Sequence, residues 1–208
     1  MNNKKLPGIP FVLSGPSGCG KGTIVKELLK KYPDTFALAV SATTRAPRVG
    51  EVDGVHYYFI TREEFERRID DQQILEYTSY CGNYYGTPKK ELYERTVSGI
   101  NVILEIEVEG AMNVRRLCPE AVLIYVLPPD AETLEARLRG RGTNTEEDIA
   151  NRLATAREEI RCLPDYDYIV INENDGAEAA ADEIVNIIAS EQHKVSRNLE
   201  NAIHFFDN

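Results

Sequence analysis

Short apolar runs alternate along the chain with segments in which apolar residues recur every three or four positions. The runs stand at 9–14, 37–42, 101–108, 121–127 and 168–172. Near-continuous apolar runs such as NVILEIEV (101–108) and AVLIYVL (121–127) are typical of parallel strands covered on both faces. The spacing between the runs predicts helices over 24–32, 130–138, 145–160 and 177–190. This alternation indicates an α/β fold with a doubly wound parallel sheet flanked by helices.

Two segments interrupt the alternation. Residues 43–95 are rich in Gly, Tyr and Thr and contain the strand-like run VHYYFI (55–60), followed by Thr61 and Glu64 at capping-box spacing. They predict an inserted small subdomain. Residues 137–155 are charged and contain GRGTNTEED, so they can bury little apolar area and predict a small mobile lid.

The chain of 208 residues is long enough for one compact domain with these two insertions. We therefore predict a single domain over 1–208. Its core is predicted to comprise 1–42, 96–136 and 156–190. Residues 191–208 are a tail in which Val195, Leu199 and Ile203 have helical spacing, which predicts one more helix.

The composition argues against several classes of function. The net charge is −10, whereas a protein that binds along nucleic-acid backbone needs a broad basic surface. No apolar run has membrane-spanning length, and the N-terminal stretch does not resemble a signal peptide. The four cysteines form no C-x-x-C pair and have no metal-ligand spacing with the three histidines. We expect a cytoplasmic protein with reduced thiols that binds neither nucleic acid nor membrane, as a monomer or a homo-oligomer.

The stretch GPSGCGK, from Gly15 to Lys21, lies between the first predicted strand and the first predicted helix. The spacing G-x-x-x-x-G-K is that of a phosphate-binding loop, in which backbone N–H groups and the helix dipole attract phosphate and the lysine adds a full charge. We therefore predict a P-loop NTPase-like fold with an ATP site. Its candidate ATP ligands are Gly15, Pro16, Ser17, Gly18, Cys19, Gly20, Lys21, Gly22 and Thr23.

The position after Lys21 departs from the usual pattern of this loop. Gly22 stands where a Ser or Thr ordinarily supplies a hydroxyl to magnesium, and Thr23 follows one residue later. Loops with G-K-G-T occur among nucleoside monophosphate kinases, where magnesium is held largely through water and substrate. The departure therefore favours a small kinase over a switch GTPase.

Three further segments carry a specific pattern. VSATTRAPRVGEVDGVHYYFIT (40–61), ILEYTSYCGNYYGTP (74–88) and GRGTNTEEDIANRL (140–153), together with the phosphate loop, closely resemble the guanylate kinases, which phosphorylate GMP from ATP. The resemblance implies that 43–95 is a GMP-binding subdomain. It also implies that ATP and GMP are the substrates, with dGMP as a further acceptor, in purine nucleotide metabolism, and that Mg²⁺ accompanies ATP.

The resemblance implies a set of GMP ligands, namely Ser41, Arg45, Arg48, Glu51, Tyr57, Glu76, Tyr85, Thr87 and Glu107. In this set Arg45 and Arg48 clamp the GMP phosphate, because guanidinium groups bind phosphate by paired hydrogen bonds. Glu76 accepts from N1–H and N2–H₂ of guanine, and Thr87 donates to O6. A site of this kind rejects a mismatched base by roughly 10⁴-fold or more.

For the transfer itself, the resemblance implies four catalytic side chains, Lys21, Arg137, Arg141 and Arg152. Their expected task is to neutralise the moving phosphoryl group, since this reaction needs alignment, charge stabilisation and exclusion of water rather than covalent help. Asn172 is expected beside the adenine ring.

Two carboxylates end the predicted strand 101–108. Glu105 and Glu107 lie two positions apart and are therefore predicted on one face of this strand, at the end of the sheet where ligands bind. The family commonly has Asp where Glu107 stands. We expect Mg²⁺ to be held through ATP and water, with Thr23 and Glu105 as candidate contacts.

Three other interpretations stay open. The stretch EVEG (107–110) faintly resembles the D-x-x-G of nucleotide switches, although no N-K-x-D is present. Guanylate-kinase-like modules that bind peptides typically lose the phosphate loop, whereas Lys21 and the loop glycines are intact here. A kinase for AMP or dTMP is disfavoured by Glu76 and Thr87.

Overall fold

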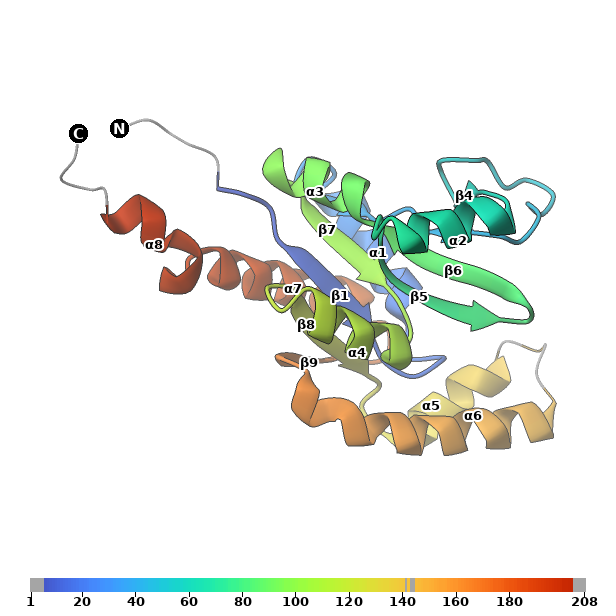
Figure 1. Cartoon of the computed structure of the whole chain (residues 1–208). Coiled ribbons are helices and arrows are strands. Elements are labelled where there is room, and N and C mark those ends of the chain that lie inside the picture. The colour runs from blue at the N-terminus through green and yellow to red at the C-terminus, as the bar shows by residue number, and fades with distance from the viewer. Residues whose placement is uncertain (1–5, 141, 143–144, 204–208) are drawn as a thin grey trace.

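The structure, a computed structural model, describes residues 6–140, 142 and 145–203 (Figure 1). At its centre is a five-stranded parallel sheet in the order β2-β7-β1-β8-β9. The strands are β1 (Pro10–Ser14), β2 (Phe36–Leu38), β7 (Asn101–Glu105), β8 (Val122–Leu127) and β9 (Tyr168–Ile171). The predicted doubly wound parallel sheet is confirmed, and ligands of such sheets bind beyond the carboxyl ends of the strands.

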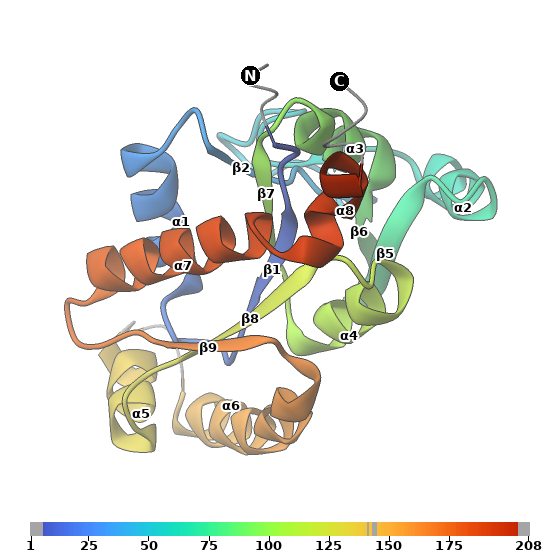
Figure 2. The ribbon, with the colours of Figure 1, turned by 90° about the vertical axis from the view of Figure 1, so that its left-hand side faces the viewer.

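Helices cover both faces of this sheet, as Figure 2 shows. They are α1 (Lys21–Lys31), α3 (Lys89–Val97), α4 (Val108–Leu117) and α7 (Ala177–Gln192). Successive residues of β1 point to opposite faces, so Leu13 packs with Leu28 of α1 and Ile184 of α7, while Val12 packs with Val114 of α4. Burial of each such side chain stabilises the fold by about 1.5–3 kcal/mol.

A second sheet of four strands has the order β4-β3-β6-β5. Its elements are β3 (Ala42–Thr43), β4 (Tyr58–Phe59), β5 (Ile74–Tyr80) and β6 (Asn83–Pro88), with α2 (Arg62–Asp70) beside them. β5 and β6 form an antiparallel hairpin, which the sequence pattern did not reveal. The predicted capping residue of α2 is confirmed, since Thr61 Oγ1 accepts from the N–H of Glu64 at 3.1 Å.

Two predicted strands have the wrong limits. The apolar run 37–42 is divided, because the chain leaves the central sheet after Leu38 and enters the second sheet at Ala42. The run 55–60 contributes only Tyr58–Phe59, because the N–H groups of Val55 and His56 both turn back to the carbonyl oxygen of Val52. Apolar residues predominate throughout both runs, whereas the ladder of backbone hydrogen bonds covers only part of each.

The predicted strand 101–108 is also too long. β7 ends at Glu105, and α4 begins at Val108 with Glu107 as its N-cap residue. Val108, Ala111 and Val114 are buried at helical spacing, so the last apolar residue of the run belongs to the helix. Glu105 and Glu107 therefore do not share one strand.

The segment after β8 folds as a helical hairpin. It consists of α5 (Ala131–Gly140) and α6 (Glu146–Glu159), followed by a short 3-10 helix, η1 (Ile160–Asp165). The two long helices pack through a small apolar cluster that includes Leu138 and Ile149. Thr145 caps α6 in a capping box with Asp148. The segment predicted as a lid, 137–155, starts within α5 and ends within α6.

The tail forms the predicted extra helix, α8 (Val195–Ile203). It is held to the body by Arg197, which donates to the carbonyl oxygen of Glu120 at 2.8 Å, and by Asn198, which donates to that of Gln192 at 2.7 Å. Within the described ranges, none of the helices combines the length and the apolar character that crossing a membrane requires.

Candidate active site

The loop between β1 and α1 has a backbone that only glycine adopts readily. Gly15, Gly18 and Gly20 have φ angles of 141°, 99° and 98°. A Cβ on Gly15 would lie 2.2 Å from the carbonyl oxygen of Val126, and one on Gly20 would lie 2.2 Å from Nδ2 of Asn172. The loop therefore packs directly against the end of β8 and the residue after β9.

Lys21 is the first residue of α1, and its side chain folds back over the loop. The residue is 9% exposed, and its ammonium group donates to the carbonyl oxygens of Gly15 and, at 3.4 Å, Pro16. The N-cap residue Gly20 offers no side-chain acceptor to the first turn of the helix. An anion at this end of α1 can take the place of a capping side chain, and Lys21 adds its charge there.

Two predicted residues meet at the carbonyl oxygen of Cys19. Asn172 Nδ2 donates to it at 2.7 Å and Arg137 Nη1 at 3.3 Å. Arg137 Nη2 also donates to the carbonyl oxygens of Asn172 and Glu173, at 2.9 and 3.0 Å. Arg137 thus joins α5 both to the phosphate loop and to the segment that follows β9.

A second arginine reaches the phosphate loop from α6. Arg152 Nη1 donates to Ser17 Oγ at 2.5 Å. Arg139 instead pairs with Glu135 and Glu146, and its side chain is 49% exposed, so it faces solvent. Arg141, the third predicted catalytic arginine, lies outside the described residues.

Two cavities lie at the carboxyl end of β7. One, of about 380 Å³, we call the phosphate-loop cavity, and its lining residues include Ser17, Lys21, Gly22, Thr23 and Lys26. The other, of about 400 Å³, we call the hairpin cavity, and its lining residues include Ser41, Tyr57, Glu76, Tyr85 and Gly86. Glu105 and Glu107 line both cavities, so the two spaces adjoin across one acidic wall.

Glu105 stands close to the unusual glycine of the loop. A Cβ on Gly22 would lie 3.5 Å from Glu105 Oε1, so the carboxylate borders the place where the usual hydroxyl would project. The surrounding protein desolvates this carboxylate and raises its pKa, while the positive charge of Lys21 opposes that rise. Among the described residues, no group of three or more His, Cys, Asp or Glu side chains is placed to hold a metal ion.

Arg45 is fixed at the edge of the hairpin cavity. It forms a two-pronged ion pair with Glu51, with N–O distances of 2.8 and 2.9 Å, and its guanidinium lies 5.4 Å from the ring centre of Tyr57. The pair raises the pKa of Arg45 and lowers that of Glu51 to about 2. Tyr57 and Tyr85 stand with ring centres 6.0 Å apart, so both phenols lie beside this guanidinium.

Arg48 is not brought into the hairpin cavity. Its side chain is exposed, and only its backbone N–H takes part, donating to Glu51 Oε2 at 2.6 Å. Glu51 therefore contacts both predicted clamp residues. Because its carboxylate pairs with the guanidinium of Arg45, it holds that side chain in place in this structure.

Glu76 and Thr87 form a buried pair behind the hairpin cavity. The residues are 5% and 1% exposed, and Thr87 Oγ1 donates to Glu76 Oε1 at 2.7 Å. Burial raises the pKa of Glu76, and the hydrogen bonds from Thr87 oppose that rise. A threonine hydroxyl has one hydrogen to donate, so here Thr87 supports the carboxylate rather than presenting its donor to a base.

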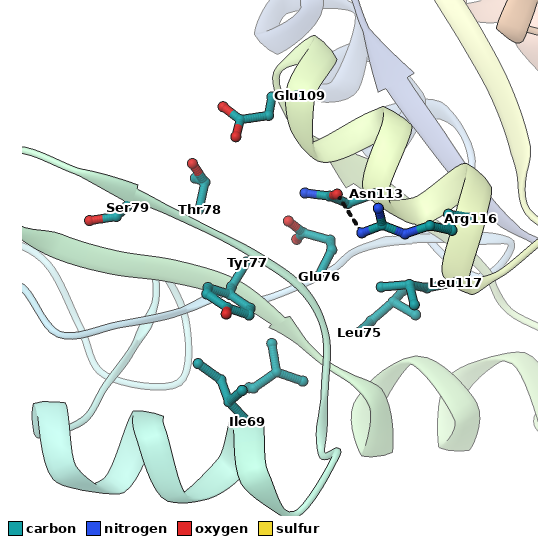
Figure 3. Close-up of a pocket in the computed structure, with 11 residues that line it drawn as sticks. Ile69, Leu75, Glu76, Tyr77, Thr78, Ser79, Glu109, Asn113, Arg116 and Leu117 are labelled. Atoms are coloured by element: carbon teal, nitrogen blue, oxygen red, sulfur yellow. Dashed lines mark hydrogen bonds between the residues drawn. The ribbon is translucent and has the colours of Figure 1, made fainter.

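A third cavity, of about 500 Å³, lies between β5 and α4 and is shown in Figure 3. Its wall includes Glu76 from β5 and Glu109 from α4, both of which also line the hairpin cavity. The carboxylate of Glu76 therefore lies where the second sheet meets the core.

Comparison with known proteins agrees with this geometry. The family model described as guanylate kinase matches residues 8–191. The chain belongs to the guanylate kinase family. A guanylate kinase of Clostridioides difficile (strain 630) is 53% identical over 190 residues, which are 91% of each chain. One of Halalkalibacterium halodurans is 49% identical over 197 residues, which are 95% of each.

The crystal structure of guanylate kinase from Anaplasma phagocytophilum is similar to this chain with a TM-score of 0.72 and 34% sequence identity. The likeness covers 97% of this chain and 96% of that one. The guanylate kinase fold thus extends over both sheets and over the helical hairpin α5–α6.

The site of this guanylate kinase family member also contains residues that the sequence did not single out. Lys26 lines the phosphate-loop cavity, and its position four residues after Gly22 places it on the same face of α1. Thr78 lines the hairpin cavity two residues after Glu76, on the same side of β5. Both spacings are visible in the sequence once the elements are known.

Proposed function

We propose that this chain transfers the γ-phosphoryl group of ATP to GMP, and likewise to dGMP, releasing ADP and GDP. One observation supports this proposal most directly: a phosphate-loop cavity and a second cavity with a buried carboxylate adjoin at Glu105 and Glu107. Two nucleotides bound in these spaces would meet with their phosphates at the shared wall. Family membership supports the same pair of substrates.

ATP is assigned to the phosphate loop. Lys21 and the N-terminus of α1 bind the outer phosphates, and Arg152, which already contacts Ser17, is placed to move onto a phosphate oxygen. Asn172 and Arg137 fix the loop through the carbonyl oxygen of Cys19. Arg141 keeps its expected catalytic role as part of this proposal.

GMP is assigned to the hairpin cavity. Arg45, supported by Glu51 and flanked by two phenols, binds the phosphate, with Arg48 approaching from the adjoining turn. Ser41 and Glu107 line the same space, and Glu76 accepts hydrogen bonds from N1–H and the 2-amino group of guanine. Adenine lacks that pair of donors, so the carboxylate selects guanine.

The transfer needs no general base from the protein. A phosphate monoester is already a nucleophile near neutral pH, so an oxygen of GMP attacks the γ-phosphorus as the bond to the ADP oxygen breaks. The protein contributes alignment, positive charge and exclusion of water. Movement of 43–95 and 137–155 toward each other would close the site, as in other small kinases.

The residues of the phosphate-loop cavity fit Mg²⁺ bound with ATP. Magnesium prefers oxygen ligands and keeps several waters, and Thr23 and Glu105 present a hydroxyl and a carboxylate to this cavity. The ion would supply charge neutralisation at the phosphates. Gly22 leaves room for a water where the usual hydroxyl would stand.

The test is a coupled assay of ADP release with MgATP and each of GMP, dGMP, AMP, CMP, UMP and dTMP. We expect turnover with GMP and dGMP and little with the others. A chain that releases no ADP with GMP, or that prefers another monophosphate, would refute the proposed function.

A further inference from the structure

The hairpin that carries Glu76 contains a β-bulge. On β5 Ile74 pairs with Pro88 of β6, and Tyr77 pairs with Gly86, so three steps along β5 match two along β6. One extra residue is therefore inserted in β5 between these pairs. A bulge of this kind bends its strand and redirects a side chain, and bulges are frequent beside active sites.

The extra residue allows two neighbouring side chains to be buried together where the hairpin meets the core. Leu75 and Glu76 both stand opposite Thr87, and each is 5% exposed. In a regular strand they would point to opposite faces and only one would be directed at the core, whereas here both are buried and both line the cavity between β5 and α4. Here Leu75 joins the apolar cluster around Val114 of α4, while Glu76 accepts the hydrogen bond from Thr87. Figure 3 shows Leu75 near Leu117, with Glu76 between β5 and α4.

Gly86 allows β6 to approach the bulge. A Cβ at this position would lie 2.6 Å from the carbonyl oxygen of Glu76 and 2.9 Å from the Cβ of Tyr77, both closer than real Cβ contacts. β6 is also paired on its other side, where Gly86 faces Ala42 of β3. Because β6 is held from that side, a side chain at 86 would displace β5 at Glu76.

Gly110 limits the same carboxylate from the side of α4. A Cβ there would lie 3.4 Å from Glu76 Oε2 and 3.3 Å from Cδ1 of Ile106. These contacts are tight but can be relieved by small shifts. An added methyl group at 110 therefore presses on the carboxylate itself and leaves the hairpin backbone in place.

We propose that the β5 bulge and Gly86 set the base specificity of the site, with Gly86 acting as a positioning residue through Glu76. The inference depends on the proposed function, because it concerns how guanine is told from other bases. A carboxylate that accepts from N1–H and the 2-amino group together must be held in one orientation. The bulge turns it into the cavity, and the absent side chain at 86 keeps it there.

The test uses GMP and inosine monophosphate, whose base is guanine without the 2-amino group. The ratio of their kcat/KM values measures how well Glu76 is placed. In Gly86→Ala we expect this ratio to fall at least about tenfold, while KM for ATP changes less than about twofold. Tyr77→Phe is the matched control, since it alters the cross-strand partner of Gly86 without adding an atom near Glu76, and its ratio should equal that of the wild type.

Circular dichroism and thermal melting show whether Gly86→Ala folds. If it does not, Gly110→Ala decides, with an expected fall of about threefold or more in the same ratio. A folded variant that keeps the wild-type ratio, or that weakens ATP and GMP equally, overturns the inference. If the wild type and the deciding variant both select GMP equally well, this inference is wrong and the proposed function stands. If the wild type is inactive on GMP, the proposed function itself is wrong.

Discussion

Replacing Thr87 with valine removes the hydroxyl that supports Glu76 and little else. The two side chains have nearly the same shape, and Thr87 is 1% exposed, so water cannot readily replace the lost donor. The hydroxyl donates at 2.7 Å to a carboxylate that is itself 5% exposed. A hydrogen bond to a charged group contributes about 1.5–3 kcal/mol. We expect Thr87→Val to lower the free energy of unfolding by about that amount at pH values above the pKa of Glu76, where the carboxylate is charged.

The loss should depend on pH in a defined direction. Burial raises the pKa of Glu76, and the Thr87 hydroxyl, which favours the ionised form, opposes the rise. The wild type therefore loses stability as pH rises through this raised pKa, and Thr87→Val raises the pKa further. The difference in unfolding free energy between the two proteins should be largest at pH values above the pKa of Glu76 in both, where the carboxylate is ionised. It should shrink as pH falls below that pKa, because the protonated carboxyl gains less from the Thr87 hydroxyl.

Urea unfolding of the wild type, Thr87→Val and Thr87→Ser at a series of pH values on both sides of the pKa of Glu76 measures the effect. Thr87→Ser keeps the hydroxyl and should show a smaller destabilisation that does not vary with pH. If Thr87→Val were as stable as the wild type at the alkaline end of the range, or equally destabilised at both ends, the buried pair would not have the role described.

Three other substitutions test the assigned roles. Lys21→Ala should lower kcat by about 10² or more without changing the circular dichroism spectrum, and near-normal turnover would contradict its role at the phosphates. Glu51→Gln should raise KM for GMP several-fold by loosening Arg45 and leave KM for ATP unchanged; because the pKa of Glu51 is about 2, this difference should be constant between pH 5 and 8. Arg152→Ala should lower kcat more than Arg139→Ala does, since only the first contacts the phosphate loop, and equal effects would argue against that assignment.

The parts of the fold that the sequence predicts well are those determined by adjacent residues. The phosphate loop is contiguous in the sequence, and its glycines predict the positive φ angles found at Gly15, Gly18 and Gly20. The buried parallel strands are nearly all apolar, so β1, β7 and β8 stand out from their surroundings. The caps at Thr61 and Thr145 depend only on the residue three positions further on.

The hairpin β5–β6 could not be found in the same way. Ile74, Leu75 and Glu76 are buried one after another, so the alternation that marks a strand is interrupted at the bulge. The hydrogen bonds that join one site residue to another are also not visible in the sequence. In this structure Thr87 donates to Glu76 across the hairpin, a contact that the sequence does not reveal, whereas the family resemblance assigned its hydroxyl to the base.

The acidic wall shows how a wrong prediction of structure led to a useful prediction of the site. Had β7 continued to residue 108, Glu105 and Glu107 would have faced one side of the sheet, and one cavity at most could have used both. The strand instead ends at Glu105, and Glu107 has the extended backbone of an N-cap residue, with ψ of 167°. The same break starts α4 early enough to place Gly110 against Glu76. One departure from regular strand thus builds both the wall between the nucleotide cavities and one boundary of the carboxylate proposed to recognise guanine.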